Sequence, residues 1–248
     1  MQLTALTEYL DELLEPSRYK DYAPNGLQVE GRAEVSRIVC GVTASQALLD
    51  AAVALHADAV LVHHGYFWKG EDSRVVGMKR RRLRTLLSHD INLLAYHLPL
   101  DGHRELGNNA QLARVLDFRP QGQAVEQELL WYGQVATPLP AGRWSDFLSE
   151  RLGRKALLLG DPERMISRVA WCTGGAQGMF DAAIALGVDA FVTGEASEQN
   201  QHMAMESGCV FVAAGHHATE RYGIEALGQK IANDLGMDVE YLDLDNPI

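Results

Sequence analysis

An internal repeat is the feature that most constrains how this chain can fold. The segment RIVCGVTASQALLDAAVALHADAVLV, residues 37–62, aligns with RVAWCTGGAQGMFDAAIALGVDAFVT, residues 168–193, at a constant offset of 131 residues. Nine of the 26 aligned positions are identical, which is about four times the number expected from ordinary amino-acid usage. The sequence therefore predicts two related structural units within one chain.

The repeat resumes further along, where AYHLPLD, residues 95–101, aligns with AGHHATE, residues 214–220, at an offset of 119. The 12 residues lost between the two alignments fall where the first unit carries an extra loop, GYFWKGEDSRVVG. Each unit then has the order strand, helix, strand, helix, strand. Such alternation is typical of an α/β fold with a largely parallel sheet.

The pattern around the repeat predicts the remaining organisation. Leucines at helical spacing predict an amphipathic helix over residues 2–15, and Ser45 is a suitable N-cap for the first helix of the repeat. We expect a first α/β unit with its N-terminal helix over 1–117 and a second α/β unit over 165–248, with a metal site between the units. The intervening residues 118–164 have no counterpart and are expected to be a linker or insertion containing one helix near 144–152.

Composition excludes several classes of protein. The chain has 248 residues, 47% of them apolar and 22% charged, which is ordinary for a globular protein. Its apolar runs are far shorter than the roughly 20 residues of a membrane-spanning helix, and its first residues do not resemble a signal peptide, so we expect a cytoplasmic protein. Cys40, Cys172 and Cys209 are far apart and form no CxxC pair, which favours buried thiols over disulfides or a thiolate zinc site.

The net charge of −11 argues against general attraction to nucleic acid or anionic lipid. The one basic cluster, MKRRRLR at residues 78–84, is interpreted as a solvated helix face, with a phosphate-steering or nucleic-acid patch as the alternative. Gly174 and Gly175 lie between a predicted strand and helix; a tight connection is favoured there over an anion-binding turn.

Metal-binding residue types recur at equivalent strand ends of the two units. His63 and His64 end one strand, and Gly65 after them permits the bend that lets both side chains converge. His97 precedes Asp101 by four residues, and His216 precedes Glu220 by four, which is the spacing of one helical turn. For the first of these pairs, Pro99 makes a loop more plausible than a helix. The repeat also places Glu195 opposite His64, and His217 follows His216 directly.

Core packing gives no reason to gather such residues, so this clustering predicts a metal site. Imidazoles with carboxylates and no thiolate suit Zn, Mn, Fe, Co or Ni better than Ca or Mg. Five or more ligands exceed the needs of one tetrahedral ion, which favours two ions bridged by a carboxylate such as Glu220. A pair of this kind predicts a hydrolase.

Three aromatic residues, Tyr66, Phe67 and Trp68, follow the histidine pair. They can stack on a substrate ring or pack against a neighbouring chain, and the sequence favours neither.

These motifs resemble the Nif-three-like dinuclear metal-centre family, in particular its short bacterial branch of YbgI type, some members of which are labelled as a second type of GTP cyclohydrolase I. The matching stretches cover nearly the whole chain and are DYAPNGLQVEG, GVTASQALLD, HADAVLVHHGYFWKG, HLPLD, ELGNNAQLA, RVAWCTGG, GVDAFVTGE and AGHHATER. The resemblance implies a Nif-three-like fold of two α/β units, a toroidal homohexamer and two divalent metal ions per chain. Its implied metal ligands are His63, His64, Asp101, His216 and Glu220.

By the same resemblance His97 lies beside the metals, where we expect it to act as general acid or base. The residues expected around the ligands, or against a substrate, are Glu195, His217, Tyr66 and Trp68. The first functional hypothesis is a metal-dependent hydrolase of a small nucleotide-like or phosphorylated compound. The alternative is a non-catalytic hexameric metal-binding scaffold or regulator, linked to DNA metabolism through the basic helix.

Overall fold

The repeated segments form the parallel centres of two separate β-sheets. In the computed structural model, which describes residues 1–248 apart from the side chain of Glu126, the chain divides into two compact units. Unit 1 comprises Met1–Gly107 and Gly223–Asp245, and unit 2 comprises Asn108–Tyr222 and Asn246–Ile248. Each unit contains helices packed on a sheet, so the expected α/β class with two similar units is confirmed.

Unit 1 has a five-stranded sheet in the order β1-β4-β3-β2-β11, in which only β1 is antiparallel to its neighbour. The strands are β1 Gly26–Val29, β2 Arg37–Thr43, β3 Ala59–His64, β4 Asn92–Ala95 and β11 Asp238–Tyr241. The helices are α1 Leu3–Leu14, η1 Pro16–Arg18, α2 Gln46–Ala54, α3 Gly77–Ser88 and α4 Leu98–Gly102, together with α9 from Gly223 onward.

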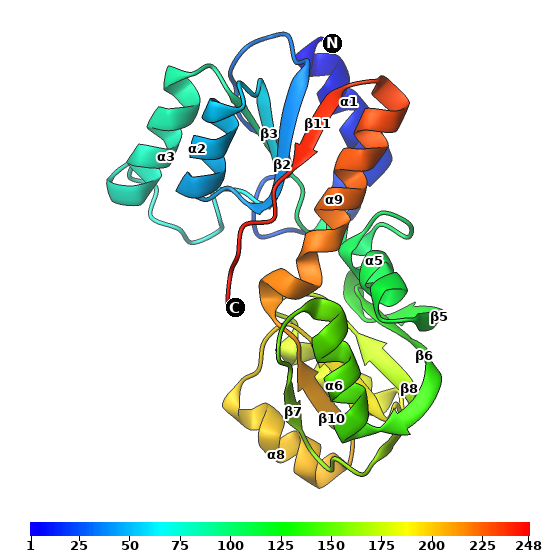
Figure 1. Ribbon diagram of the computed structural model, residues 1–248. Helices are drawn as coiled ribbons and strands as arrows, with labels where there is room; N and C mark the ends of the chain where they lie inside the picture. Colours follow the sequence, from blue (N-terminus) through cyan, green and yellow to red (C-terminus); the bar gives the residue numbers. More distant parts are fainter. The chain divides into compact units, whose positions relative to one another are not determined.

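Both faces of this sheet are covered by helices. Helices α2 and α3 pack on one face, and α1 with the later turns of α9 packs on the other (Figure 1). The predicted N-terminal helix is confirmed, with its four leucines at positions 3, 6, 10 and 14 buried. Ser45 caps α2 as expected, because its Oγ accepts from the Leu48 N–H at 3.2 Å. Burial on both faces explains why the central strands are continuous apolar runs.

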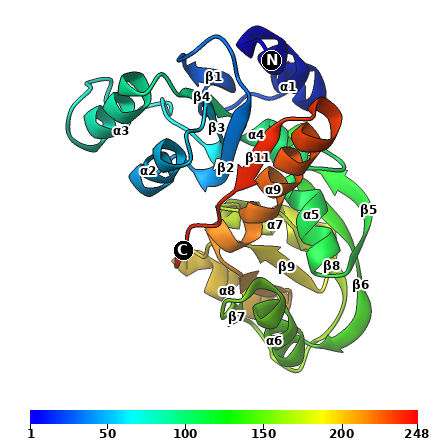
Figure 2. The same ribbon diagram turned by 45° about the horizontal axis from the view of Figure 1, so that its top comes forward.

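Unit 2 has a six-stranded sheet in the order β5-β6-β8-β9-β10-β7 (Figure 2). The strands are β5 Phe118–Ala124, β6 Leu130–Pro140, β7 Leu157–Leu159, β8 Met165–Trp171, β9 Ala190–Thr193 and β10 Val210–Ala213. The helices are α5 Asn108–Val115, η2 Glu126–Glu128, α6 Ala141–Leu152, η3 Gln177–Met179, α7 Phe180–Ala185, α8 Glu198–Ser207 and the start of α9 His216–Leu235.

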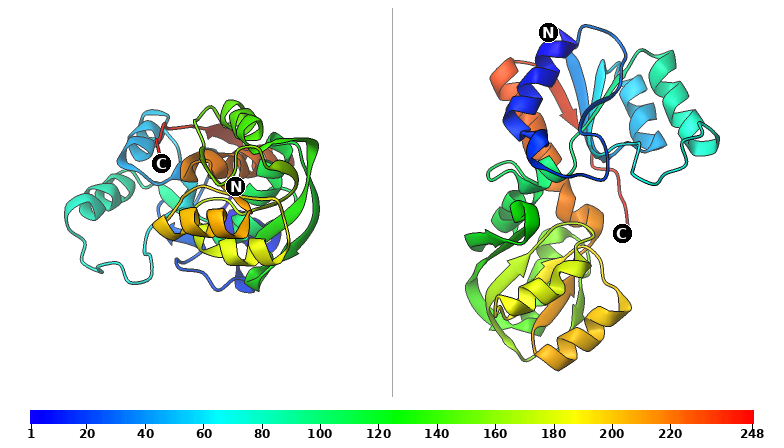
Figure 3. Two further views of the ribbon diagram at one scale, coloured as in Figure 1. Left: turned by 90° about the horizontal axis from the view of Figure 1, so that it is seen from below. Right: turned by 180° about the vertical axis from the view of Figure 1, so that it is seen from behind.

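Unit 2 also buries both faces of its sheet. Helices α5 and α6 pack on one face around Trp144 and Trp171. On the other face Phe180, Phe191 and Phe211 pack together, with ring centroids 4.9 to 5.9 Å apart. Helices α7 and α8, yellow to gold in the right-hand view of Figure 3, lie on that side.

Residues 118–164, expected to be a linker or insertion, are part of the sheet of unit 2. They supply β5, β6, α6 and β7, and β6 pairs antiparallel with β8. The later turns of α9 and strand β11 belong to unit 1, although the sequence boundaries assigned residues 165–248 to the second unit. The difference arises because antiparallel strands joined by short turns carry no repeat signal, and because one helix continues from unit 2 into unit 1.

The three cysteines are buried, and none of them forms a disulfide in the described structure. Over the described residues, no helix combines the length and the apolar character that crossing a bilayer requires.

Candidate metal centre

His63 and His64 end strand β3, and their rings lie 4.5 Å apart between centroids. The His63 side chain is fully buried, and its Nδ1 lies 3.0 Å from the carbonyl oxygen of Tyr96. Because a carbonyl only accepts, Nδ1 carries a proton, and in the neutral imidazole Nε2 then keeps its lone pair. Nδ1 of His64 lies 3.3 Å from the hydroxyl of Thr43, which can accept in the same way.

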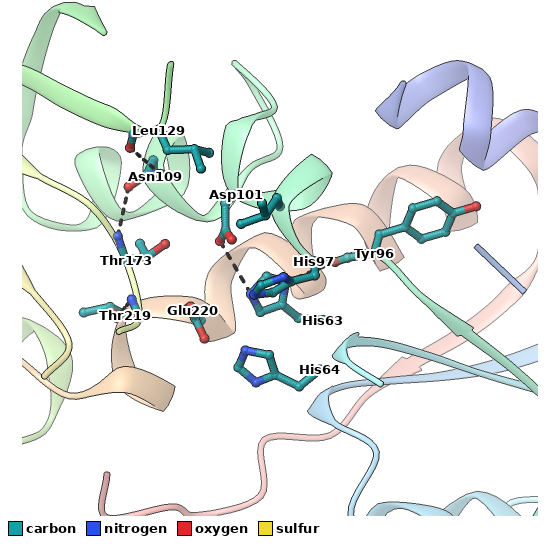
Figure 4. Close-up of polar contacts among 12 residues, drawn as sticks. His63, His64, Tyr96, His97, Asp101, Asn109, Leu129, Thr173, Thr219 and Glu220 are labelled. Carbon is teal, nitrogen blue, oxygen red and sulfur yellow. Dashed lines mark hydrogen bonds and ion pairs between the residues drawn. The ribbon is translucent and has the colours of Figure 1, made fainter. Parts of the chain in front are cut away.

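Asp101 lies on α4, whose first turn includes Pro99. The expectation of a loop at this point was wrong, since proline is tolerated in the first turn of a helix, where its missing N–H has no partner to lose. The Asp101 N–H donates to the His97 carbonyl at 3.1 Å, which places both residues on one turn. Asp101 Oδ1 lies 3.5 Å from Nε2 of His63 (Figure 4). Two ligand atoms on one tetrahedral zinc ion are about 3.4 Å apart, so this spacing suits a shared ion.

His97 follows strand β4 and joins the two histidines of β3. One ring nitrogen from each of His63, His64 and His97 lies within 4.8 Å of the other two. Nδ1 of His97 lies 2.7 Å from Oδ1 of Asp21, a carboxylate whose side chain is 4% exposed. Burial alone would raise the pKa of Asp21, but its hydrogen bonds and the charge of His97 outweigh burial and lower that pKa to about 2. Asp21 is therefore ionised at neutral pH.

In unit 2 the first turn of α9 carries the second group of ligand-type residues. His216 Nε2 lies 3.0 Å from Glu220 Oε2, which confirms the predicted one-turn pair, and His216 Nδ1 lies 2.6 Å from Glu195 Oε1. Burial would lower the pKa of His216, but the hydrogen bonds and charges of Glu220 and Glu195 raise it to about 9. Without a metal, a proton on His216 therefore balances the two carboxylates.

The glycine turn after β8 packs directly against this pair. Gly174 has a φ of 68°, and a Cβ at this position would collide with the Glu220 carboxylate. Its N–H donates to the buried hydroxyl of Thr219 at 3.0 Å, and its carbonyl accepts from Thr193 at 3.0 Å. This turn is therefore closely packed against the first turn of α9.

The other residues expected near the ligands, Tyr66, Trp68 and His217, differ in burial and in their contacts. Tyr66 is buried within unit 1, where its hydroxyl donates to the Ala44 carbonyl at 2.7 Å. Trp68 is only partly buried, with its ring centroid 5.0 Å from that of His97 and 6.0 Å from that of His64. His217 is partly buried, and its N–H donates to the Ile248 carbonyl at 3.0 Å.

Sequence reasoning did not identify the residues that hold the ligands in place. Asp21 and Thr43 anchor histidines. In unit 2, Asn109 holds the turn that follows β8 (Figure 4). The Asn109 side chain accepts from the Thr173 N–H at 3.1 Å and donates to the Leu129 carbonyl at 3.3 Å. Asp21 and Asn109 lie in the DYAPNG and GNNAQLA motifs, which were the only signal available for them.

Comparison with known proteins agrees with this architecture. A family model described as Duf34/NIF3 (NGG1p interacting factor 3) matches residues 1–247. A Pseudomonas aeruginosa protein named GTP cyclohydrolase 1 type 2 homolog is 56% identical over 248 residues, covering 99% of this chain and 98% of that protein. Protein ybgI, a solved structure described as of unknown function, matches over the whole of both chains with 54% identity and a TM-score of 0.97. TTHA1606 from Thermus thermophilus also matches over the whole of both chains, with 32% identity and a TM-score of 0.90. The chain therefore belongs to the Duf34/NIF3 family, which confirms the resemblance found in its sequence.

Proposed function

We propose that the protein holds two divalent metal ions and uses them to hydrolyse a small nucleotide-like or phosphorylated compound. The proposed site draws its ligands from both units. These ligands are His63, His64 and Asp101 of unit 1 and His216 and Glu220 of unit 2.

The anchoring of the histidines supports this proposal most strongly. In each of the four, Nδ1 lies against an oxygen that can accept its proton: the Tyr96 carbonyl for His63, Thr43 for His64, Asp21 for His97 and Glu195 for His216. Such outer contacts fix the tautomer and direct Nε2 at a metal, and they are the usual companions of metal-binding histidines.

The donor set fits a pair of ions better than one. Three imidazoles and two carboxylates exceed the four positions of a tetrahedral ion, so together these five residues would hold two ions, with Glu220 as the residue they would share. The absence of thiolates among the proposed ligands and the number of imidazoles favour Zn, Mn, Fe, Co or Ni. When bound, such a pair supplies Lewis-acid activation of water for hydrolysis.

Two of the chain's own residues would serve the reaction beside the ligands. Imidazole is the commonest general acid or base in enzymes, so we propose His97, held by Asp21, for that role. Trp68 offers a partly exposed ring face that can pack against a substrate ring. The name GTP cyclohydrolase 1 type 2 homolog, carried by relatives such as the Pseudomonas aeruginosa protein, supports a nucleotide-like substrate.

A substrate screen tests the hydrolase proposal. Protein loaded with Zn²⁺ or Mn²⁺ is assayed against nucleotides, cyclic nucleotides, phosphate esters and small amides, beside His64→Ala and the control His202→Ala. His202 lies exposed on α8 and is paired with Glu198, outside the proposed site. We expect turnover that His64→Ala lowers by about 100-fold or more and that His202→Ala retains.

A fully loaded protein that hydrolyses none of these compounds would contradict the proposal and favour a non-catalytic metal-binding scaffold or regulator. We further propose that the protein assembles as a toroidal homohexamer. This part of the proposal rests on the family resemblance.

A further inference from the structure

The loop between η1 and β1 holds His97 through two side chains, those of Asp21 and Asn25. We propose that Asp21 and Asn25 form a clamp that fixes His97 as its Nδ1–H tautomer. Nε2 is then the nitrogen that His97 offers to the cluster with His63 and His64. Asp21 is in this view a positioning residue, which acts through His97.

The clamp makes hydrogen bonds to both the ring and the backbone N–H of His97. Oδ1 of Asp21 accepts from Nδ1 of His97 at 2.7 Å, and Oδ2 accepts from the Leu98 N–H at 2.9 Å. Oδ1 of Asn25 accepts from the His97 N–H at 2.7 Å. Asn25 Nδ2 donates to Oδ2 of Asp21 at 2.9 Å, so the two side chains of the clamp are also bonded to each other.

The groups around the Asp21 carboxylate allow only one position for the proton of a neutral His97 ring. An ionised carboxylate only accepts, so every group within hydrogen-bond distance of Asp21 must donate to it. The N–H of Tyr22, Asn25 Nδ2 and the Leu98 N–H do so, and His97 Nδ1 lies at the same carboxylate. Neutral His97 must therefore carry its proton on Nδ1. Nε2 keeps the lone pair that a base or a metal ligand needs.

Aromatic packing restrains the ring further. The rings of Trp68 and Tyr22 meet the His97 ring nearly edge-on or at a steep angle, with centroids 5.0 and 6.5 Å away. The ring can therefore not flip and exchange its two nitrogens without breaking the contact to a buried carboxylate. The clamp explains why the DYAPNG motif accompanies HLPLD in one sequence: the two segments are more than 70 residues apart but meet at His97.

This inference builds on the metal-centre part of the proposed function but is tested separately from it. Long-range ¹H–¹⁵N correlation spectra of the side-chain imidazoles show which ring nitrogen carries the proton. Spectra are recorded at pH 8.5 for the metal-free and the Zn²⁺-loaded protein, and the signals of His97 are assigned by their loss in His97→Asn. We expect wild-type His97 to show a protonated Nδ1 and an unprotonated Nε2 in both states.

Asp21→Ala removes the acceptor, so His97 should lose this single tautomer and populate both. Asp50→Ala is the matched control, because Asp50 is an exposed carboxylate on α2 whose side chain accepts from Gln46 and lies away from His97. Once a substrate is found, Asp21→Ala should lower kcat by about 10- to 100-fold with a smaller effect on KM.

Wild-type His97 with its proton on Nε2 would overturn the clamp, and that measurement does not depend on whether any variant folds. An Asp21→Ala spectrum in which His97 is unchanged would overturn it as well. A protein that binds no Zn²⁺ but retains the Nδ1–H tautomer would contradict the metal centre and support the clamp.

Discussion

Gly174 occupies a position where a side chain cannot be accommodated. Its backbone is in the left-handed region, and the space that a Cβ would fill belongs to the carboxylate of Glu220, with His216 Nε2 only 3.1 Å away. The glycine therefore sets the distance between the turn after β8 and the first turn of α9. Gly178, four residues later, has nothing within 4 Å of its Cβ position and no positive φ.

This contrast predicts opposite outcomes for two equal substitutions. Gly174→Ala should destabilise the fold by about 1–3 kcal/mol, because the left-handed conformation is strained for alanine and the added methyl displaces Glu220. Gly178→Ala should be neutral or stabilise by up to about 1 kcal/mol, because it restricts the unfolded chain at no cost to the folded one. Thermal unfolding of both variants checks this, and an unchanged Tm for Gly174→Ala would contradict it.

At the residue scale, the sequence predicts which side chains can bind a metal, but not which residues hold those side chains in position. His63, His64 and His216 were identifiable because their residue type and strand-end positions are local signals. Asp21 was not, because its partner His97 lies 76 residues away and nothing in the loop's own pattern shows that contact.

At the scale of elements, the repeat preserves the same hydrogen bonds around one aspartate in each unit. We call this aspartate and the two backbone N–H groups that donate to it the corner. Asp58 precedes β3 and accepts from the N–H groups of Ser36 and Arg37. Asp189 precedes β9 and accepts from those of Ser167 and Arg168 in the same way. Each carboxylate also pairs with an arginine, at 2.7 Å for Asp58 and 2.8 Å for Asp189. The two aligned segments therefore share this aspartate because it makes the same hydrogen bonds just before a central strand in each unit.

The corner also predicts a pH dependence of stability. Partial burial would raise the pKa of Asp58, but hydrogen bonds from Ser36 and Arg37 and the charge of Arg32 outweigh it and hold that pKa below its ordinary value. A lowered folded pKa means that the ionised carboxylate stabilises the fold above the unfolded pKa of about 3.9, and that this contribution is lost as pH falls through the lower folded pKa.

Asp58→Asn should accordingly cost about 1–3 kcal/mol at pH 7, and the difference from wild type should shrink below about pH 4. Thermal unfolding between pH 3 and 7 measures this, with Asp50→Asn as the control on an exposed carboxylate. A difference between wild type and Asp58→Asn that stays constant over this range would contradict the assignment.

Elements with strong periodicity or a repeat partner were predictable, and those defined by distant pairing were not. Helices α1 and α2 and the central parallel strands follow from leucine spacing, a serine cap and apolar runs. The role of residues 118–164 was missed because antiparallel edge strands such as β5 are largely exposed and carry little apolar pattern. The short helix α4 was missed because Pro99 indicates a break unless the helix start is known.

At the scale of the whole molecule, the proposed assembly has a direct test. Light scattering of the protein at micromolar concentration should give about six times the chain mass of 27.3 kDa, which is the closed homohexamer that the family resemblance implies. A monomer under these conditions would contradict the hexamer and would leave the metal centre untouched.

The proposed metal centre takes ligands from both units, each of which folds around its own sheet. Two independent sites would respond separately to substitutions, since a change in one unit would leave the metal of the other unit bound. A joint centre would respond to a change in either unit. Ligand removal in each unit in turn therefore separates the two cases.

The most direct measurement is the metal content of protein purified without chelators, determined by elemental analysis for wild type, His64→Ala of unit 1 and Glu220→Ala of unit 2, with His202→Ala as the control. We expect about two ions per chain in wild type and control, and fewer than about one in both ligand variants. Two ions per chain retained in His64→Ala and in Glu220→Ala would contradict it.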